Sequence, residues 1–362
     1  MGTDRLVFFR ADGNSQIASG HLLRCISIAG ACRALGMEVR FLVSDAESVF
    51  LLQTKLSADF PIIRLTGAAY DQLENELPEL LTILGEARKQ NPILFLDSYF
   101  VTESYLAQIR TLAKVVYLDD LMLFDYPVDL LINYDVISDC NLPSYRSAYQ
   151  NAHKLLLGAK YAPLRNQFSN RKIPVREKVS NILITTGGSD PFHFCIRLID
   201  FLRQTPFWDE AVSSGVTFRI LIGYMSPDKT ALASLAGSVP ALALYENITD
   251  MASFMAECDL AVSAGGTTLY ELCAVGLPSI SYTMADNQIP AANAFASESI
   301  IPCAGDIRTS MESVMETVHR FLSQMTEANR DSYAKRKSAH ETMRRLIDGN
   351  GSLKIAETVL SL

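Results

Sequence analysis

The chain has 362 residues, 49% of them hydrophobic, which is typical of two domains that each bury a core. Its 32 Lys and Arg residues against 40 Asp and Glu residues give a formal net charge of −8, so we do not expect it to bind nucleic acid. No apolar run approaches the ~20 residues of a membrane span, and the start of the chain lacks the apolar core of a secretion signal. We therefore expect a cytoplasmic protein without stable membrane association.

Short apolar strands alternate with helical stretches through the first half of the chain. A helix is expected from Leu22 to Leu35, ended by Gly36, and the expected strands are 6–9, 39–43, 62–65, 93–96, 115–118 and 130–133. This alternation predicts an α/β domain with a mainly parallel sheet. We assign residues 1–160 to this Rossmann-like domain and the Arg-, Lys- and Pro-rich stretch from Tyr161 to Val179 to a linker.

The alternation resumes in the second half and predicts another doubly wound domain at 175–345. The expected strands are 181–186, 217–222, 241–245, 260–263 and 278–282. The basic run 330–345 is interpreted as a solvated helix face, with a functional basic patch as the alternative. Residues 346–362 are expected to form a C-terminal helix, and we hypothesise that this helix packs back on the first domain.

Metal-ligating and redox patterns are missing from the sequence. The seven cysteines are scattered without Cys-x-x-Cys spacing and are expected to be reduced core residues. The five histidines form no His-Glu-x-x-His pattern, and no Asp-x-Asp pair is present to hold a divalent ion on a diphosphate. We therefore predict neither a metal nor a cofactor.

A strand at 260–263 leads through two glycines into a helix. In the run Gly265-Gly266-Thr267-Thr268, the glycines make a turn without side-chain bulk and the threonines begin the helix. The first amides of such a helix have no partner inside it, and the helix dipole adds partial positive charge. The turn therefore predicts an anion site, and Glu271, about one turn into the helix, could reach a ribose beside it. The alternative is an ordinary capping turn with a surface glutamate.

A second glycine turn follows another strand of the same domain. The strand 181–186 ends in Gly187-Gly188-Ser189, and Pro191 is expected at the first position of the next helix. In an open parallel sheet, ligands bind beyond the carboxyl ends of the strands, where the topology reverses. The two turns together favour a site for a nucleoside diphosphate.

A long polar loop connects the first strand to the first helix, and long loops at strand ends tend to carry function. It runs from Arg10 through Asp12 to Gly20 and His21. At a helix start, the positive end of the dipole favours a neutral imidazole, which can act as a general base. The alternative is a histidine that caps the helix or packs on its first turn.

These motifs resemble those of the UDP-sugar hydrolases of pseudaminic acid biosynthesis, in order and spacing along nearly the whole chain. The residues that carry the resemblance are Arg10-Ala11-Asp12, Gly20-His21-Leu22-Leu23-Arg24-Cys25, Asp97-Ser98-Tyr99, Gly187-Gly188-Ser189-Asp190, Ser263-Ala264-Gly265-Gly266-Thr267-Thr268-Leu269-Tyr270-Glu271 and Ala285-Asp286-Asn287-Gln288. The resemblance implies a GT-B fold of two Rossmann-like domains with a ligand cleft between them. Its fold relative is the glycosyltransferase that adds N-acetylglucosamine during peptidoglycan synthesis.

The resemblance also implies an activity, the hydrolysis of UDP-2,4-diacetamido-2,4,6-trideoxy-β-L-altropyranose to the free sugar and UDP. His21 would be the base that activates water for inverting attack, and Tyr99 and Asn287 would orient the sugar or the water. The other matched positions would bind substrate or UDP: Arg10, Asp12, Gly20, Arg24, Gly187, Gly188, Ser189, Gly265, Gly266, Thr267, Thr268, Glu271, Asp286 and Gln288. Two positions depart from the family pattern, since Ala18 stands where glycine is frequent and Thr267 where serine is usual.

Three functions remain open from the sequence. A hydrolase would act on a UDP-diacetamido sugar alone, a GT-B glycosyltransferase would pass a UDP-amino sugar to an acceptor, and a noncatalytic protein would bind the nucleotide sugar without turnover. UDP is a good leaving group, so each enzyme would need mainly to hold the diphosphate and activate the attacking group. We expect the hydrolase, acting as a monomer.

Overall fold

The computed structural model describes residues 5–17, 19–55, 59–171, 173–223 and 225–362, and the chain divides into two compact units. The first unit comprises residues 1–166 and 350–362, and the second comprises residues 167–349. The predicted second domain, 175–345, lies within the second unit, which begins eight residues earlier and ends four residues later. Ala18, the position where the family often has glycine, lies outside the described residues.

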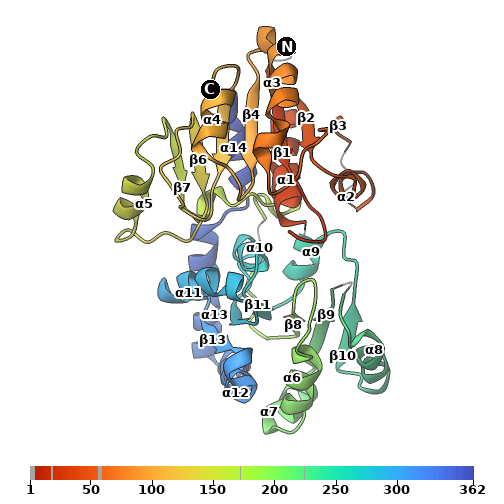
Figure 1. The fold of residues 1–362 in the computed structure, drawn as a ribbon. Coiled ribbons are helices and arrows are strands. Elements are labelled where there is room, and N and C mark those ends of the chain that lie inside the picture. Colours follow the sequence, from red (N-terminus) through yellow and green to blue (C-terminus); the bar gives the residue numbers. More distant parts are fainter. Residues whose placement is uncertain (1–4, 18, 56–58, 172, 224) are drawn as a thin grey trace. The chain divides into compact units, whose positions relative to one another are not determined.

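The first unit is built on a seven-stranded parallel sheet in the order β3-β2-β1-β4-β5-β6-β7 (Figure 1). Its strands are β1 (Leu6–Ala11), β2 (Glu38–Val43), β3 (Ile62–Arg64), β4 (Ile93–Asp97), β5 (Lys114–Leu118), β6 (Leu130–Asn133) and β7 (Leu155–Leu157). Its helices are α1 (Gly20–Ala34), α2 (Ala46–Phe50), α3 (Leu77–Glu86), α4 (Glu103–Ile109), α5 (Leu142–Ala148) and α14 (Gly351–Leu360). The buried strands read as near-continuous apolar runs because helices cover both faces of the sheet.

The final helix, α14, belongs to the core of the first unit. Ile355, Ala356 and Val359 are buried in one hydrophobic cluster with residues of α1 and β1, and α14 lies beside elements of this unit in Figure 1. The chain therefore returns to its first unit after completing the second.

The second unit has a six-stranded parallel sheet in the order β10-β9-β8-β11-β12-β13. Its strands are β8 (Asn181–Thr185), β9 (Thr217–Leu221), β10 (Leu242–Tyr245), β11 (Leu260–Ala264), β12 (Ser279–Thr283) and β13 (Cys303–Asp306). Its helices are α6 (Phe194–Leu202), α7 (Pro206–Ser213), α8 (Lys229–Ser238), α9 (Met251–Ala256), α10 (Thr268–Val275), α11 (Ile289–Ser297), α12 (Ile307–Thr326) and α13 (Arg330–Leu346). The prediction of two doubly wound α/β domains is thus confirmed, with β7 and β13 as strands that the sequence analysis missed.

One predicted helix start is wrong. Pro191 was expected at the first position of a helix, but α6 begins three residues later, at Phe194. The carboxylate of Asp190 accepts hydrogen bonds from the amides of Phe194 and Cys195 at 2.9 and 2.8 Å. Because these bonds satisfy the first amides of α6, the helix begins where the Asp190 carboxylate can reach it.

Each sheet reverses its direction of winding at one place. In the first unit the reversal lies between β1 and β4, and in the second it lies between β8 and β11. Crevices at the carboxyl ends of such strand pairs are where open α/β sheets bind ligands. Both predicted motif clusters follow these strands, so the fold places them at the expected edge of each sheet.

Candidate functional site

His21 lies at the start of α1 and is held by the end of the neighbouring strand. Its Nδ1 is 2.6 Å from Oδ1 of Asp97, the last residue of β4, and both side chains are buried. Strands β1 and β4 pair in parallel with Ala11 opposite Asp97, which brings the loop after β1 to this carboxylate. A carboxylate on Nδ1 favours the tautomer with the proton there, so Nε2 keeps a lone pair.

Arg24 fixes the carboxylate that holds His21. Its Nε and Nη2 donate to the two oxygens of Asp97, both at 2.6 Å, while Nη1 donates to Asp120 at 3.0 Å and to Tyr134 at 2.8 Å. Burial alone would raise the pKa of Asp97, but the charges of Arg24 and His21 outweigh burial and hold this pKa well below its usual value. In this structure the guanidinium of Arg24 orients Asp97, and a substrate contact of Arg24 stays a prediction.

Tyr99 packs against the imidazole of His21. The two rings meet edge to face with centroids 4.6 Å apart, and Tyr99 is 39% exposed. Its hydroxyl donates to Asp120 at 3.4 Å. Burial and the charge of Asp120 raise the pKa of Tyr99 to about 12, so its hydroxyl remains a hydrogen-bond donor near neutral pH.

Arg10 and Asp12 form a buried ionic cluster with Glu76. Arg10 is fully buried, its Nη1 is 2.6 Å from Asp12, and its Nε and Nη2 donate to Glu76 at 2.8 Å. Asp12 also accepts from the amide of Ser44 at 2.7 Å. Both side chains were predicted to touch substrate, and here their polar atoms hold the loop after β1. The sequence offered no signal for Glu76, which lies 66 residues from Arg10.

The two glycine turns of the second unit emerge side by side. Strands β8 and β11 pair in parallel with Thr185 opposite Ser263, and each turn begins two residues later. The Gly265 and Gly266 amides bond to carbonyl oxygens of Tyr282 and Ala264, at 2.8 and 2.9 Å. These bonds set the shape of the turn that leads into α10.

The start of α10 presents backbone amides that have no acceptor in the described part of the chain. Among the described residues, no hydrogen bond is made by the backbone amides of Thr267 or Thr268, and the Thr267 hydroxyl makes no capping bond. Thr267 is exposed, and Glu271 lies in the first turn of the same helix, partly buried. This geometry suits an anion, because the helix dipole and two unbonded amides point the same way.

The turn at Gly187 and Gly188 is supported by a glycine that the sequence analysis missed. A Cβ atom added at Gly223, just after β9, would lie 2.2 Å from the carbonyl oxygen of Gly188. Gly187 itself has φ +78°, a conformation that favours glycine, and Ser189 follows partly buried. The close approach of two backbones explains why glycine stands at position 223.

We predict that Gly223→Ala displaces this turn. The added methyl group must push the Gly188 carbonyl away, so ligand affinity at the turn is expected to fall about tenfold or more, with some loss of stability. Calorimetric titration with UDP measures the effect. Gly237→Ala in α8 is the matched control, since a Cβ there meets nothing within 4 Å. Equal UDP affinity in both variants would show that the turn does not touch the ligand.

The loop after β12 carries the last predicted residues. Asp286 is ion-paired with Arg308 at 2.7 Å, and Oε1 of Gln288 accepts from the amide of Met284 at 2.9 Å. Asn287 lies between them, exposed, with no side-chain hydrogen bond to a described residue. Asp286 and Gln288 therefore brace the loop that presents Asn287.

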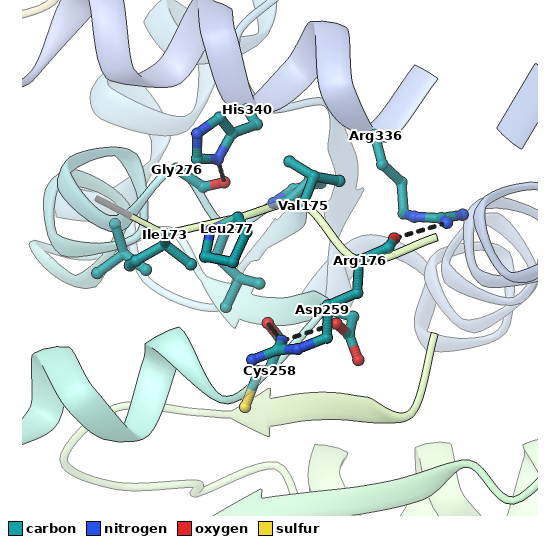
Figure 2. Close-up of a pocket in the computed structure, with 12 residues that line it drawn as sticks. Ile173, Val175, Arg176, Cys258, Asp259, Gly276, Leu277, Arg336 and His340 are labelled. Atoms are coloured by element: carbon teal, nitrogen blue, oxygen red, sulfur yellow. Dashed lines mark hydrogen bonds and ion pairs between the residues drawn. The ribbon is translucent and has the colours of Figure 1, made fainter. Parts of the chain in front are cut away.

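Part of the basic run 330–345 faces inward. That part is neither a solvated helix face nor an exposed basic patch. Three of its side chains turn inward from α13 toward backbone carbonyls: Arg336 donates to Glu177, His340 lies 2.7 Å from the Gly276 oxygen, and Arg344 donates to Ala274. Figure 2 shows Arg336 and His340 beside a cavity of about 20 Å³, near the amino ends of β11 and β12. Arg344 turns inward because a cation is favoured at the carbonyl end of a helix such as α10.

The described residues contain neither a metal-ligating cluster nor a membrane-spanning helix. Within the ranges given above, three or more His, Cys, Asp or Glu side chains never gather as a metal ion would require. None of the helices in the same ranges combines the length and apolar character needed to cross a bilayer.

Comparisons with known proteins agree with this architecture. Residues 182–347 match the family described as glycosyltransferase family 28 C-terminal domain. Over 59% of its length, the chain is 26% identical to the spore coat polysaccharide biosynthesis protein SpsG of Bacillus subtilis, of which the match covers 58%. The chain thus spans less than two thirds of that relative.

The resemblance drawn from the motifs is confirmed by another relative. Over 58% of its length, the chain is 24% identical to the UDP-2,4-diacetamido-2,4,6-trideoxy-beta-L-altropyranose hydrolase of Campylobacter jejuni, of which the match covers 69%. Among solved structures, MurG of Acinetobacter baumannii superposes with a TM-score of 0.69 at 15% identity, covering 99% of this chain and all of that one. The protein is therefore an α/β protein of the GT-B fold, whose residues 182–347 match the C-terminal domain of glycosyltransferase family 28.

Proposed function

We propose that this protein hydrolyses a UDP-linked 2,4-diacetamido-2,4,6-trideoxy sugar to the free sugar and UDP, as a cytoplasmic monomer in pseudaminic acid biosynthesis. The observation that carries the proposal is the 2.6 Å contact between His21 and Asp97 at the winding reversal of the first sheet. A histidine oriented by a buried carboxylate is the arrangement that general-base catalysis requires. The similarity to a hydrolase of this name supports the choice of reaction.

In the proposed step, Nε2 of His21 takes a proton from water. The water oxygen forms a bond to the anomeric carbon as the bond to the UDP oxygen breaks, and UDP leaves with the electron pair. Asp97 keeps the proton on Nδ1 and stabilises the imidazolium that forms. Tyr99, beside the ring and protonated near neutral pH, would donate a hydrogen bond to the sugar or to the water.

We assign the UDP moiety to the second unit. The unbonded amides at the start of α10 would hold the diphosphate, and Glu271 would accept from the ribose hydroxyls. Three glycines of the predicted site, Gly20, Gly188 and Gly266, have open space around them and no positive φ. Because the protein's own packing does not require glycine there, close approach of a ligand to the backbone is the explanation we favour.

The test is UDP release with water as the only acceptor. We expect a UDP-2,4-diacetamido-trideoxy sugar to give stoichiometric UDP and free sugar, with turnover unchanged by EDTA. Mass spectrometry of the products in ¹⁸O-labelled water should place the label in the sugar and not in UDP, since water attacks carbon. Binding without UDP release would instead indicate a noncatalytic protein.

The family 28 match supports one rival, a glycosyltransferase that uses a UDP-amino sugar. Such an enzyme would release UDP slowly in water and faster when an acceptor is added. A panel of UDP-diacetamido and UDP-N-acetyl sugars, each with and without acceptor alcohols, therefore separates the two activities.

We predict that Glu271→Ala weakens UDP binding by the value of a charged hydrogen bond, about 1.5 to 3 kcal/mol. Calorimetry with UDP measures the loss. Glu298→Ala, a change at an exposed glutamate at the end of α11, is the control for lost charge and should leave UDP affinity unaltered. If Glu271→Ala binds UDP as tightly as the wild type, Glu271 does not contact the ribose.

A further inference from the structure

A basic hollow opens at the amino-terminal edge of the first sheet, at the opposite ends of the strands from Asp97. Its volume is about 800 Å³. Four cationic side chains line it, together with the side chain of Asp129 and the end of the chain after α14, where Lys114 donates to an oxygen of Leu362; the cations are Arg5, Arg88, Arg110 and Lys114. We call this feature the amino-edge hollow.

The strand order explains why these cations meet. Strands β1, β4 and β5 are consecutive neighbours, with Val7 opposite Ile93 and Ile93 opposite Lys114. The residues that precede each strand therefore arrive at one edge of the sheet. Arg5 precedes β1, Arg88 lies in the short helix before β4, and Arg110 ends α4 just before β5. Their sequence positions are far apart, so no local pattern reveals the cluster.

Three of the four cations of the amino-edge hollow have no side-chain partner in the described part of the chain, whereas Lys114 donates to an oxygen of Leu362. The side chains of Arg5, Arg88 and Arg110 form no ion pair or hydrogen bond with any residue that the structure describes. Asp129 is already engaged, since its Oδ2 accepts from the Val115 amide at 2.8 Å and its Oδ1 lies 3.8 Å from His153. Three guanidinium groups without a partner among the described residues therefore share one concave surface, although the net charge of the chain is −8.

We propose that the amino-edge hollow binds a small anion of two or more negative charges, with phosphate or diphosphate as its charged group. Planar guanidinium groups match phosphate oxygens with paired hydrogen bonds, and several can share one such group. The volume lies within the range of small-molecule sites. A long polyanion is disfavoured, because the net negative charge of the protein would repel the parts that extend beyond the hollow. This site is separate from the nucleotide site proposed in the second unit.

The experiment is calorimetric titration of the full chain with inorganic pyrophosphate in saturating UDP, which occupies the proposed nucleotide site. We expect binding that weakens as salt is raised, and a loss of at least about tenfold in the double variant Arg88→Gln/Arg110→Gln. Both side chains are exposed, so the variant should fold normally. The matched control is Arg320→Gln/Arg345→Gln, which removes the same charge from exposed positions of the second unit and should bind as wild type.

Hydrogen exchange locates the bound anion, with protection expected at residues 88–92 and 110–114. A second arm uses vesicles of phosphatidylglycerol, against phosphatidylcholine, to separate a lipid headgroup from a soluble phosphate. The proposal is overturned if pyrophosphate does not bind, if both double variants lose affinity equally, or if only vesicles bind. Loss of pyrophosphate binding when UDP is added would also overturn it, since the anion would then occupy the nucleotide site. None of these outcomes depends on whether His21 catalyses hydrolysis.

Discussion

Replacing His21 with asparagine is expected to lower kcat by about 10²-fold or more, while UDP affinity stays near that of the wild type. Asparagine keeps a hydrogen bond toward Asp97 but has no basic nitrogen to take a proton from water. The two effects separate because the base acts only in the chemical step, whereas UDP is assigned to groups of the second unit. Steady-state kinetics and UDP calorimetry on one preparation measure both.

The pH profile adds an independent readout. In the wild type, kcat should fall as the solution is acidified, because a protonated imidazole cannot accept a proton from water. In His21→Asn that acid limb should vanish. The control is His153→Asn, at an exposed histidine, which should keep both the rate and the limb.

Two results would contradict this role for His21. Near-full hydrolysis by His21→Asn, or a loss of UDP affinity as steep as the loss of rate, would make His21 a capping or binding residue. Asp12 is the nearest carboxylate in the same loop, and the sequence offers it as the alternative base. In the structure its oxygens already contact Arg10 and the Ser44 amide, so it would have to give up these contacts to take a proton.

Replacing Arg10 with methionine is expected to destabilise the first unit by about 3 to 5 kcal/mol. Arg10 is fully buried, and burial would lower its pKa, but the charges of Asp12 and Glu76 outweigh burial and raise it. Without the guanidinium, two carboxylates would remain buried next to each other with no cation between them. The fold would then either protonate them or open the loop after β1.

Hydrogen exchange of peptides that cover β1 measures this change within the first unit. The matched control is Arg40→Met on the adjacent strand β2, where the side chain is 37% exposed and pairs with Glu38 at 2.6 Å. The ion pair between Arg40 and Glu38 should contribute at most about 1 kcal/mol to the stability of the fold. If Arg10→Met lowers the stability no more than Arg40→Met does, the buried cluster of Arg10, Asp12 and Glu76 does not stabilise the fold.

Much of the fold could be predicted because local patterns report it directly. Strands buried on both faces appear as short apolar runs, and the loops that follow them stand out by their glycines and polar residues. The strand ending at Ser263 and the run from Gly265 to Thr268 are one example, and the loop from Arg10 to His21 is another. In both, the information lies within about a dozen consecutive residues.

The sequence by itself therefore determined the two α/β domains, the glycine turns and the histidine at the start of the first helix. Only the tertiary structure decided which side chains these residues contact. Asp97 meets His21 across 76 residues and Glu76 meets Arg10 across 66, because β1 lies beside β4 and α3 follows β3. The inward turn of Arg336 likewise depends on where α13 packs. Such pairs are set by strand order and helix packing, and no local periodicity encodes them.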